Sequence, residues 1–220
     1  IVYFFHITSL SIIVYGLNGY VWLYNITSCK ILKITRHCVI IDLVVGMIYN
    51  YSELLKKKSR KEIETLVLNK KLYKLETGIY SDTLVGDDLV VYSKKYKSSI
   101  VTMESAFYYY DLTDVVPTVT TLATLSNARK IKNKNVKQYY VPKGRFESGK
   151  VLERVKDGSF YIYDKERLLV ELVRNKNKMS LEYYKEIIRN YRAISDKLNF
   201  RKVDKYLKLY KNEDNLSNII

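Results

Sequence analysis

The stretch from Thr102 to Leu122 constrains the fold of this chain more than any other part of the sequence. Its first half carries the start signals of a short helix, a Ser/Thr residue followed by an acid, and the helical pattern stops near Asp111. Pro117 then disfavours helix at the residue before it, and a β-rich run follows. The sequence therefore predicts a short helix, a loop and a strand.

A second stretch, from Tyr161 to Leu172, combines a strand and a helix in the opposite order. Its alternating side chains predict a strand that ends near Tyr163, and an amphipathic helix with acids in its first turn follows. A hairpin signal at Lys156, Asp157 and Gly158 precedes that strand. Further helices are predicted downstream, over residues 165–174, 180–192, 199–210 and 214–219. Strands followed by helices predict an α+β domain over residues 84–220 that ends in a helical bundle.

Together, the two stretches resemble the AbiEi family of antitoxins from type IV toxin-antitoxin and abortive-infection systems. The resemblance extends from about Met47 to the end of the chain, and the hairpin between Lys74 and Asp82 shares it. Four residues stand at positions of the family's helix motifs: Ser105, Asp164, Glu166 and Arg167. Where the family often has His-Gly before a Leu-Thr-Asp turn, this chain has Tyr110 and Asp111, so no role of that His carries over.

The resemblance implies a cytoplasmic antitoxin of phage defence with two functions. An N-terminal winged helix would bind operator DNA and repress the chain's own operon. A larger domain would counter a cognate nucleotidyltransferase toxin, with or without direct contact. It implies no enzymatic activity, metal or cofactor.

The charge balance favours a polyanionic partner. The chain has 38 Lys and Arg residues against 23 Asp and Glu, a formal net charge of +15, and each phosphate that a cation neutralises releases condensed counterions. A lysine-rich solvated surface is the alternative explanation. Both Cys, both His and the single Trp precede Met47. Because residues 47–220 contain neither Cys nor His, catalysis by these residues, an ordinary zinc site and a disulfide are excluded for that part of the chain. The absence of a disulfide fits a reducing cytosol.

Residues 1–46 differ from the remainder. No charged residue occurs from Ile1 to Cys29, and this length would cross a bilayer as a helix, with the cations at 30, 33 and 36 on its cytoplasmic flank. The segment nevertheless contains Asn, His and several Ser and Thr residues, and the family resemblance begins at Met47. We expect an upstream extension that precedes a natural start at Met47, and a membrane anchor is the alternative.

Residues 47–83 predict a small winged helix-turn-helix. Ser52 and Ser59 are candidate caps of two short helices, and Ile63, Leu66 and Leu68 are candidate inward contacts. The hairpin that follows has Gly78 at a position of positive φ. Arg60 is the candidate base-reading residue, since its planar fork can pair with guanine. The full set of predicted DNA-binding residues is Ser59, Arg60, Lys61, Glu64, Lys70, Lys71, Lys74 and Thr77. A typical winged helix has three helices, and only two fit in this segment. The alternative is therefore a module that serves only for packing and does not bind DNA.

A second basic stretch lies in the larger domain, with tyrosines among its cations. Cations interleaved with aromatic residues suit RNA or single-stranded nucleic acid, because bases stack on Tyr. Lysines that protect an exposed strand edge are an equally good explanation. The predicted nucleic-acid or partner surface comprises Arg129, Lys130, Lys132, Lys134, Lys137, Tyr139, Lys143 and Arg145.

Asp164, Glu166 and Glu171 allow a different class of function, a metal-dependent nucleic-acid-processing enzyme. No Gly-rich phosphate loop accompanies these acids. The plainer interpretation is a buried Arg167 that joins the sheet to the helix through hydrogen bonds to carboxylates.

Overall fold

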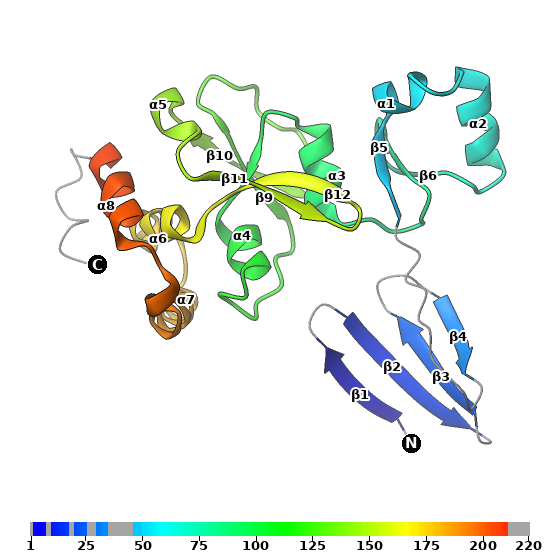
Figure 1. The fold of residues 1–220 in the computed structure, drawn as a ribbon, viewed down its shortest axis with the longest axis horizontal. Coiled ribbons are helices and arrows are strands. Elements are labelled where there is room, and N and C mark those ends of the chain that lie inside the picture. The colour runs from blue at the N-terminus through cyan, green and yellow to red at the C-terminus, as the bar shows by residue number, and fades with distance from the viewer. Residues whose placement is uncertain (1, 8–9, 18–19, 26–29, 35–45, 211–220) are drawn as a thin grey trace. The chain divides into compact units, whose positions relative to one another are not determined.

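The computed structural model describes residues 2–7, 10–17, 20–25, 30–34 and 46–210. The chain divides into two compact units, Ile1–Gly86 and Asp87–Ile220. Helices and strands are mixed in both (Figure 1), so the protein is an α+β protein. The predicted helix at residues 214–219 lies outside the described residues.

The first strands of the chain form a four-stranded antiparallel sheet in the order β1-β2-β3-β4. Their bounds are Val2–Ile7, Leu10–Leu17, Tyr20–Asn25 and Lys30–Ile34. These residues form strands rather than the single long helix that the membrane-anchor alternative requires. Within the described ranges, no helix combines the length and apolar character needed to cross a bilayer.

The remainder of the first unit is a strand, two short helices and a hairpin. The sheet has the order β5-β7-β6 and is antiparallel throughout. The bounds are β5 Ile48–Asn50, α1 Tyr51–Leu55, α2 Arg60–Leu68, β6 Tyr73–Glu76 and β7 Ile79–Ser81. Gly78 has φ +79° in the hairpin turn, as predicted from its sequence position.

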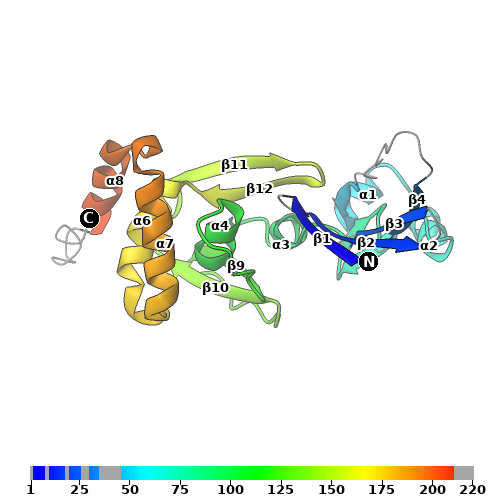
Figure 2. The same ribbon diagram turned by 90° about the horizontal axis from the view of Figure 1, so that it is seen from below.

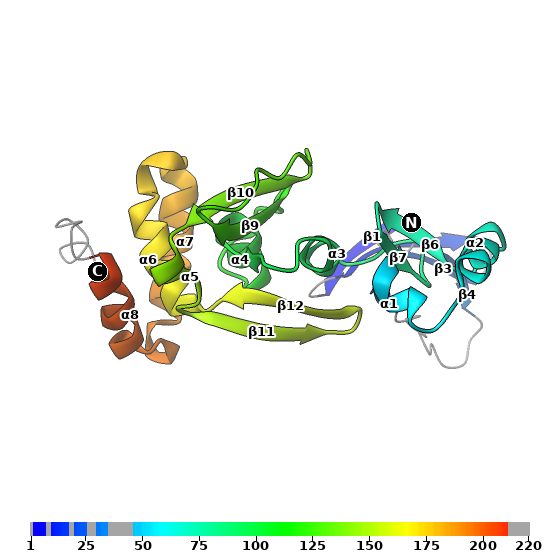
Figure 3. The same cartoon turned by 90° about the horizontal axis from the view of Figure 1, so that it is seen from above.

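The second unit is built on a five-stranded mixed sheet in the order β10-β9-β8-β12-β11. β9 and β10 are parallel, and β8 pairs antiparallel with β9 and parallel with β12. β11 and β12 form an antiparallel hairpin (Figure 3). The strand bounds are β8 Ile100–Val101, β9 Thr120–Leu125, β10 Val136–Val141, β11 Lys150–Val155 and β12 Gly158–Tyr163. The hairpin predicted at Lys156–Gly158 is confirmed.

Helices α3, α4 and α5 accompany the sheet, and α6, α7 and α8 form a group beside one end of it (Figure 2). The bounds are α3 Asp88–Lys95, α4 Met103–Tyr109, α5 Lys143–Phe146, α6 Lys165–Arg174, α7 Leu181–Ala193 and α8 Phe200–Leu207, with 3-10 turns η1 Lys176–Lys178, η2 Ser195–Lys197 and η3 Lys208–Tyr210. The predicted short helix before Asp111 and the strand-to-helix change at Asp164 are both confirmed.

The core of this unit lies between the sheet and α4 and α6. Phe107 on α4, Leu122 on β9, Ile162 on β12 and Leu168 on α6 are fully buried. Burial of apolar surface at about 25 cal/mol per Å² is the main stabilising contribution of such contacts. The same core fixes the position of α6, which carries the charged residues described below.

Candidate functional site

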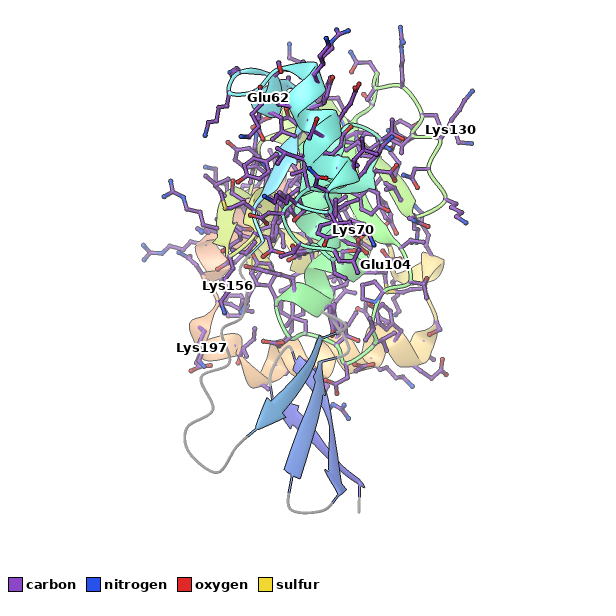
Figure 4. All side chains as sticks on the ribbon, turned by 90° about the vertical axis from the view of Figure 1, so that its right-hand side faces the viewer. Glu62, Lys70, Glu104, Lys130, Lys156 and Lys197 are labelled. Atoms are coloured by element: carbon purple, nitrogen blue, oxygen red, sulfur yellow. The ribbon has the colours of Figure 1, made fainter. Side chains whose placement is uncertain are left out.

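The predicted DNA-binding residues of the first unit are all exposed. Ser59 is the N-cap of α2, Arg60 and Lys61 lie in its first turn, and Glu64 lies one turn further on. Lys70 and Lys71 follow its C-terminal end, Lys74 lies on β6, and Thr77 lies in the hairpin turn. The labelled residues Glu62 and Lys70 mark the two ends of the helix in Figure 4. Exposed cations therefore occur at the start of α2, just after its end and at one position of the hairpin in the same small module.

The start of α2 is fixed by a capping box. The Glu62 backbone N–H donates to the Ser59 hydroxyl oxygen at 3.3 Å, and the Ser59 N–H donates to the Glu62 carboxylate at 2.6 Å. The hydrogen bond from the Ser59 N–H to the carboxylate is the largest cause that holds the pKa of Glu62 below its ordinary value, and the Ser59 side chain contributes next. The cap predicted for the first helix is wrong, because Asn50 rather than Ser52 accepts from the Glu53 N–H, at 2.9 Å.

A small apolar cluster holds α2 against the neighbouring elements. Leu54 of α1, Ile63 of α2 and Leu72 before β6 are buried together, with Tyr80 among the half-buried residues packed on them. The prediction that Leu68 points inward is wrong, since 81% of it is exposed. α2 thus packs chiefly through Ile63 and leaves its N-terminal turn open to solvent.

The basic stretch of the second unit divides into solvent-exposed and engaged residues. Arg129, Lys130, Lys132, Lys134 and Lys143 are exposed, and Lys130 lies on the loop between β9 and β10 in Figure 4.

Lys137 and Tyr139 are engaged with one carboxylate. The Lys137 Nζ lies 2.6 Å from Glu104 Oε1, and the Tyr139 hydroxyl donates to both Glu104 oxygens at 3.2 Å. These two residues therefore attach β10 to α4, a contact that the charge pattern alone did not indicate. Arg145 lies at a different place, with its guanidinium carbon 4.3 Å from the centre of the Tyr210 ring.

Ser105, the first of the family-motif residues, is buried and joins α4 to β9. Its N–H donates to the Thr121 hydroxyl at 2.9 Å, and its hydroxyl accepts from the Thr121 N–H at 2.9 Å. Thr121 in turn donates to the carbonyl of Thr102. This reciprocal pair gives the Ser a structural function.

Arg167 is completely buried at the centre of a polar network. Its Nη2 lies 2.7 Å from Glu171 Oε1 and also donates to the Tyr210 hydroxyl, which donates to the same carboxylate. Burial, followed by the charge of Glu171, raises the pKa of Tyr210 to about 12, so its hydroxyl stays protonated. Arg167 is buried and hydrogen-bonded to a carboxylate, as predicted. Its side-chain partners Glu171 and Tyr210 lie on α6 itself and in η3, so these bonds do not join the sheet to the helix as predicted.

The three acids considered for metal binding each have other partners. Asp164 caps α6 by accepting from the Arg167 N–H at 2.8 Å and from the Tyr206 hydroxyl at 2.8 Å. Glu166 accepts from the Asn199 N–H at 2.9 Å. Within the described part of the chain, no three His, Cys, Asp or Glu residues are grouped closely enough to hold a metal ion.

A cavity of about 280 Å³ lies where β10 ends and α6 ends. The residues that line it come from distant parts of the chain and include Thr102, Tyr139, Tyr140, Arg145, Tyr163, Glu171, Arg174, Lys178 and Tyr210. Of these, only Tyr139 and Arg145 belong to the predicted surface. Arg174, Lys178 and Tyr210 were missed, because the sequence signal at each is an ordinary helix end or a core tyrosine.

Comparison with known protein families finds no match for this chain, and a search of curated proteins finds no similar one.

Proposed function

We propose that the chain is a cytoplasmic antitoxin that resembles the AbiEi type and represses its own operon by binding operator DNA through residues 46–86. The observation that carries the DNA-binding part is the start of α2. Its capped first turn is solvent-exposed and basic, while its opposite face is held by Ile63 in a buried cluster.

The order of elements supports a winged helix-turn-helix. Two short helices precede a hairpin, and a strand before the helices pairs with that hairpin. In such modules, the N-terminal residues of the second helix contact base edges in the major groove, while the wing contacts the backbone. Arg60 and Lys61 are then at the major groove, and Lys74 with Thr77 is at the phosphates.

The charge of the module fits this function. Residues 46–86 contain eight Lys and Arg residues against five Asp and Glu. Phosphate contacts by exposed lysines supply non-specific affinity, and base contacts supply sequence preference. Arg60, with its five donors in a planar fork, is the residue suited to the second task.

The antitoxin part of the proposal rests on the sequence resemblance. In this chain the motif residues Ser105, Asp164 and Arg167 have structural partners, so they maintain the domain that would counter the nucleotidyltransferase rather than perform chemistry. We therefore propose no enzymatic activity and no cofactor for the second unit.

The test is DNA binding by the full chain to the region upstream of its own gene, measured by fluorescence anisotropy at several salt concentrations. Replacing Arg60 and Lys61 with Ala is expected to weaken binding at least about tenfold, because each such interaction is worth about 1–3 kcal/mol. The variant should also show a smaller salt dependence, by about 0.9 in the logarithmic slope for each phosphate that the variant no longer neutralises.

The matched control removes the same charge elsewhere. Lys156 and Lys197 are exposed residues of the second unit, and replacing both with Ala lowers the net charge equally. This control should bind DNA like the parent chain. Equal losses of affinity in the two variants would attribute binding to net charge alone, and unchanged binding by the Arg60/Lys61 variant would remove α2 from the mechanism.

Growth of cells that express a cognate nucleotidyltransferase toxin tests the second function. Co-expression of the chain should restore growth, and the Arg60/Lys61 variant should do so as well, because the second unit is intact in it. Continued toxicity with the parent chain present would contradict the antitoxin proposal.

A further inference from the structure

Among the described residues that line the cavity in the second unit, cations outnumber acids. Arg145, Arg174 and Lys178 line it, and Glu171 is the acid among its lining residues. That carboxylate is already neutralised, since Arg167 Nη2 lies 2.7 Å from one oxygen and Arg174 Nη1 lies 2.8 Å from the other. The cations therefore outnumber the acid, and an anion that enters the cavity meets a favourable field.

Two of these cations have unused hydrogen-bonding capacity. Among the described residues, neither Arg145 nor Lys178 forms an ion pair. The Arg145 guanidinium carbon instead lies over the Tyr210 ring, 4.3 Å from its centre. Stacking on a ring leaves the edge of a guanidinium open, and that edge has the geometry that pairs with a phosphate.

The buried arginine behind the cavity adds to the field. Arg167 has no exposed surface, and its Nε and Nη1 have no hydrogen-bond partner in the described structure. Its guanidinium carbon lies 5.3 Å from the centre of the Tyr163 ring and 5.2 Å from that of Tyr210, and both rings line the cavity. The charge of Arg167 is only partly compensated and is surrounded by a low dielectric. It therefore attracts an anion on the cavity side of the Tyr163 and Tyr210 rings.

The volume of the cavity and the tyrosine in its lining indicate which class of anion it binds. A volume of about 280 Å³ lies just below the range of about 300 to 1,000 Å³ that is typical of small-molecule sites, so the ligand must be small. Tyr140 lines the cavity and is 49% exposed, on edge strand β10. An exposed Tyr beside arginines is the arrangement on which nucleobases stack. The lining includes Val141 and Pro142 at the carboxyl end of β10, together with Thr102 and Met103 at the start of α4.

We propose that this cavity binds a nucleoside monophosphate, with the phosphate at Arg145 and Lys178 and the base on Tyr140. The ligand is either a free mononucleotide or the 5′-phosphorylated terminal nucleotide of a single strand, since both present the same chemistry. The inference concerns the second unit alone and does not depend on DNA binding by α2.

The experiment is calorimetric titration of the full chain with AMP, CMP, GMP and UMP. Arg145→Gln should weaken binding of the best ligand about tenfold or more, because a hydrogen bond to a charged group is removed. Tyr140→Ala should weaken it at least about fivefold because the base loses its stacking partner. The unphosphorylated nucleoside should bind at least about tenfold more weakly than its monophosphate.

Matched controls are available in the same unit. Arg154 and Tyr161 are exposed on β11 and β12, away from the cavity lining. Arg154→Gln and Tyr161→Ala should therefore leave nucleotide binding unchanged. The Arg60/Lys61 variant should still bind the nucleotide, which would show that this site is separate from the DNA-binding surface. Loss of nucleotide binding in that variant would overturn the assignment to the cavity.

Further titrations identify the source of the ligand. A 5′-phosphorylated trinucleotide that competes with the monophosphate at equal affinity would indicate a strand end, and weaker competition would indicate the free nucleotide. Absence of binding by all four monophosphates at millimolar concentration would overturn the proposal. So would binding that Arg145→Gln and Tyr140→Ala leave unchanged, or an affinity for inorganic phosphate equal to that for the nucleotides.

Discussion

Replacing Ile63 with Ala should unfold the small module that carries α2. Ile63 is 2% exposed and packs in the cluster with Leu54 and Leu72. It is the buried residue of its helix, so the change removes the principal packing interaction that positions α2.

The loss of stability in Ile63→Ala can be estimated from the burial of the side chain. Truncation to Ala removes apolar carbon worth about 0.8 kcal/mol per CH2 group, or about 2.4 kcal/mol for the side chain beyond Cβ. The cavity that remains raises the cost into the range of about 2–5 kcal/mol measured for such core truncations. A core as small as this one supplies about 3–5 kcal/mol in total. The module should therefore lose most of its stability.

Hydrogen exchange measured by mass spectrometry resolves this effect by segment. Peptides from residues 48–81 should lose protection in Ile63→Ala, while peptides from the sheet of the second unit keep theirs. DNA binding should fall in parallel, because α2 is no longer held.

Leu68→Ala is the matched control on the same helix. Its side chain is 81% exposed, so the change should alter stability by less than about 0.5 kcal/mol. Retained protection of residues 48–81 in Ile63→Ala, or an equal decrease in Leu68→Ala, would refute the packing argument.

Three further predictions concern charge and backbone geometry. Glu171→Gln leaves buried Arg167 without its carboxylate and should destabilise the second unit by about 3–5 kcal/mol in chemical denaturation, whereas Glu147→Gln, whose side chain is 67% exposed, should cost less than about 1 kcal/mol. Gly149→Ala should lower the melting temperature, because Gly149 has φ +80° and an added Cβ would lie 2.6 Å from the Arg167 Cβ; an unchanged melting temperature would contradict this close approach. The pKa of Glu62 in an NMR titration should lie below that of an unfolded peptide. A folded pKa below the unfolded one contributes stability above the unfolded pKa that is lost as the pH falls through the folded value, and a pKa at or above the peptide value would contradict the capping box.

Local signals predicted the secondary structure well where the partners are close in sequence. The Ser59–Glu62 capping box joins residues three apart, and the positive φ of Gly78 belongs to one turn, so both could be inferred from the chain. The misplaced cap at Ser52 had a comparable local signal, but Asn50 two residues earlier accepts the hydrogen bond.

The candidate site in the second unit could not be predicted in this way. Lys137 was assigned to a basic surface, but it lies on β10 and its carboxylate partner Glu104 lies on α4, which is distant in the sequence. Tyr210 has the spacing of a core residue, and only the folded chain brings it to Arg145 and Arg167. Such interactions depend on how elements pack, which a periodic pattern within one element does not contain.

The short strand β8 joins the two halves of the sheet on which the ligand site is built. The sheet consists of a β9–β10 half and a β11–β12 half, and the two-residue strand β8 is paired to β12 through Val101 and Ile162. So short a ladder supplies little backbone hydrogen bonding, and packing among the fully buried Val101, Leu122 and Ile162 carries most of the attachment.

The cavity takes one wall from β10, in the first half, and another from α6, which directly follows β12 in the second. The width of the cavity therefore depends on the packing at β8, which joins the two halves of the sheet. Replacing Ile162 with Val, which removes one methyl group, is expected to change ligand selectivity although no residue of the cavity lining is altered.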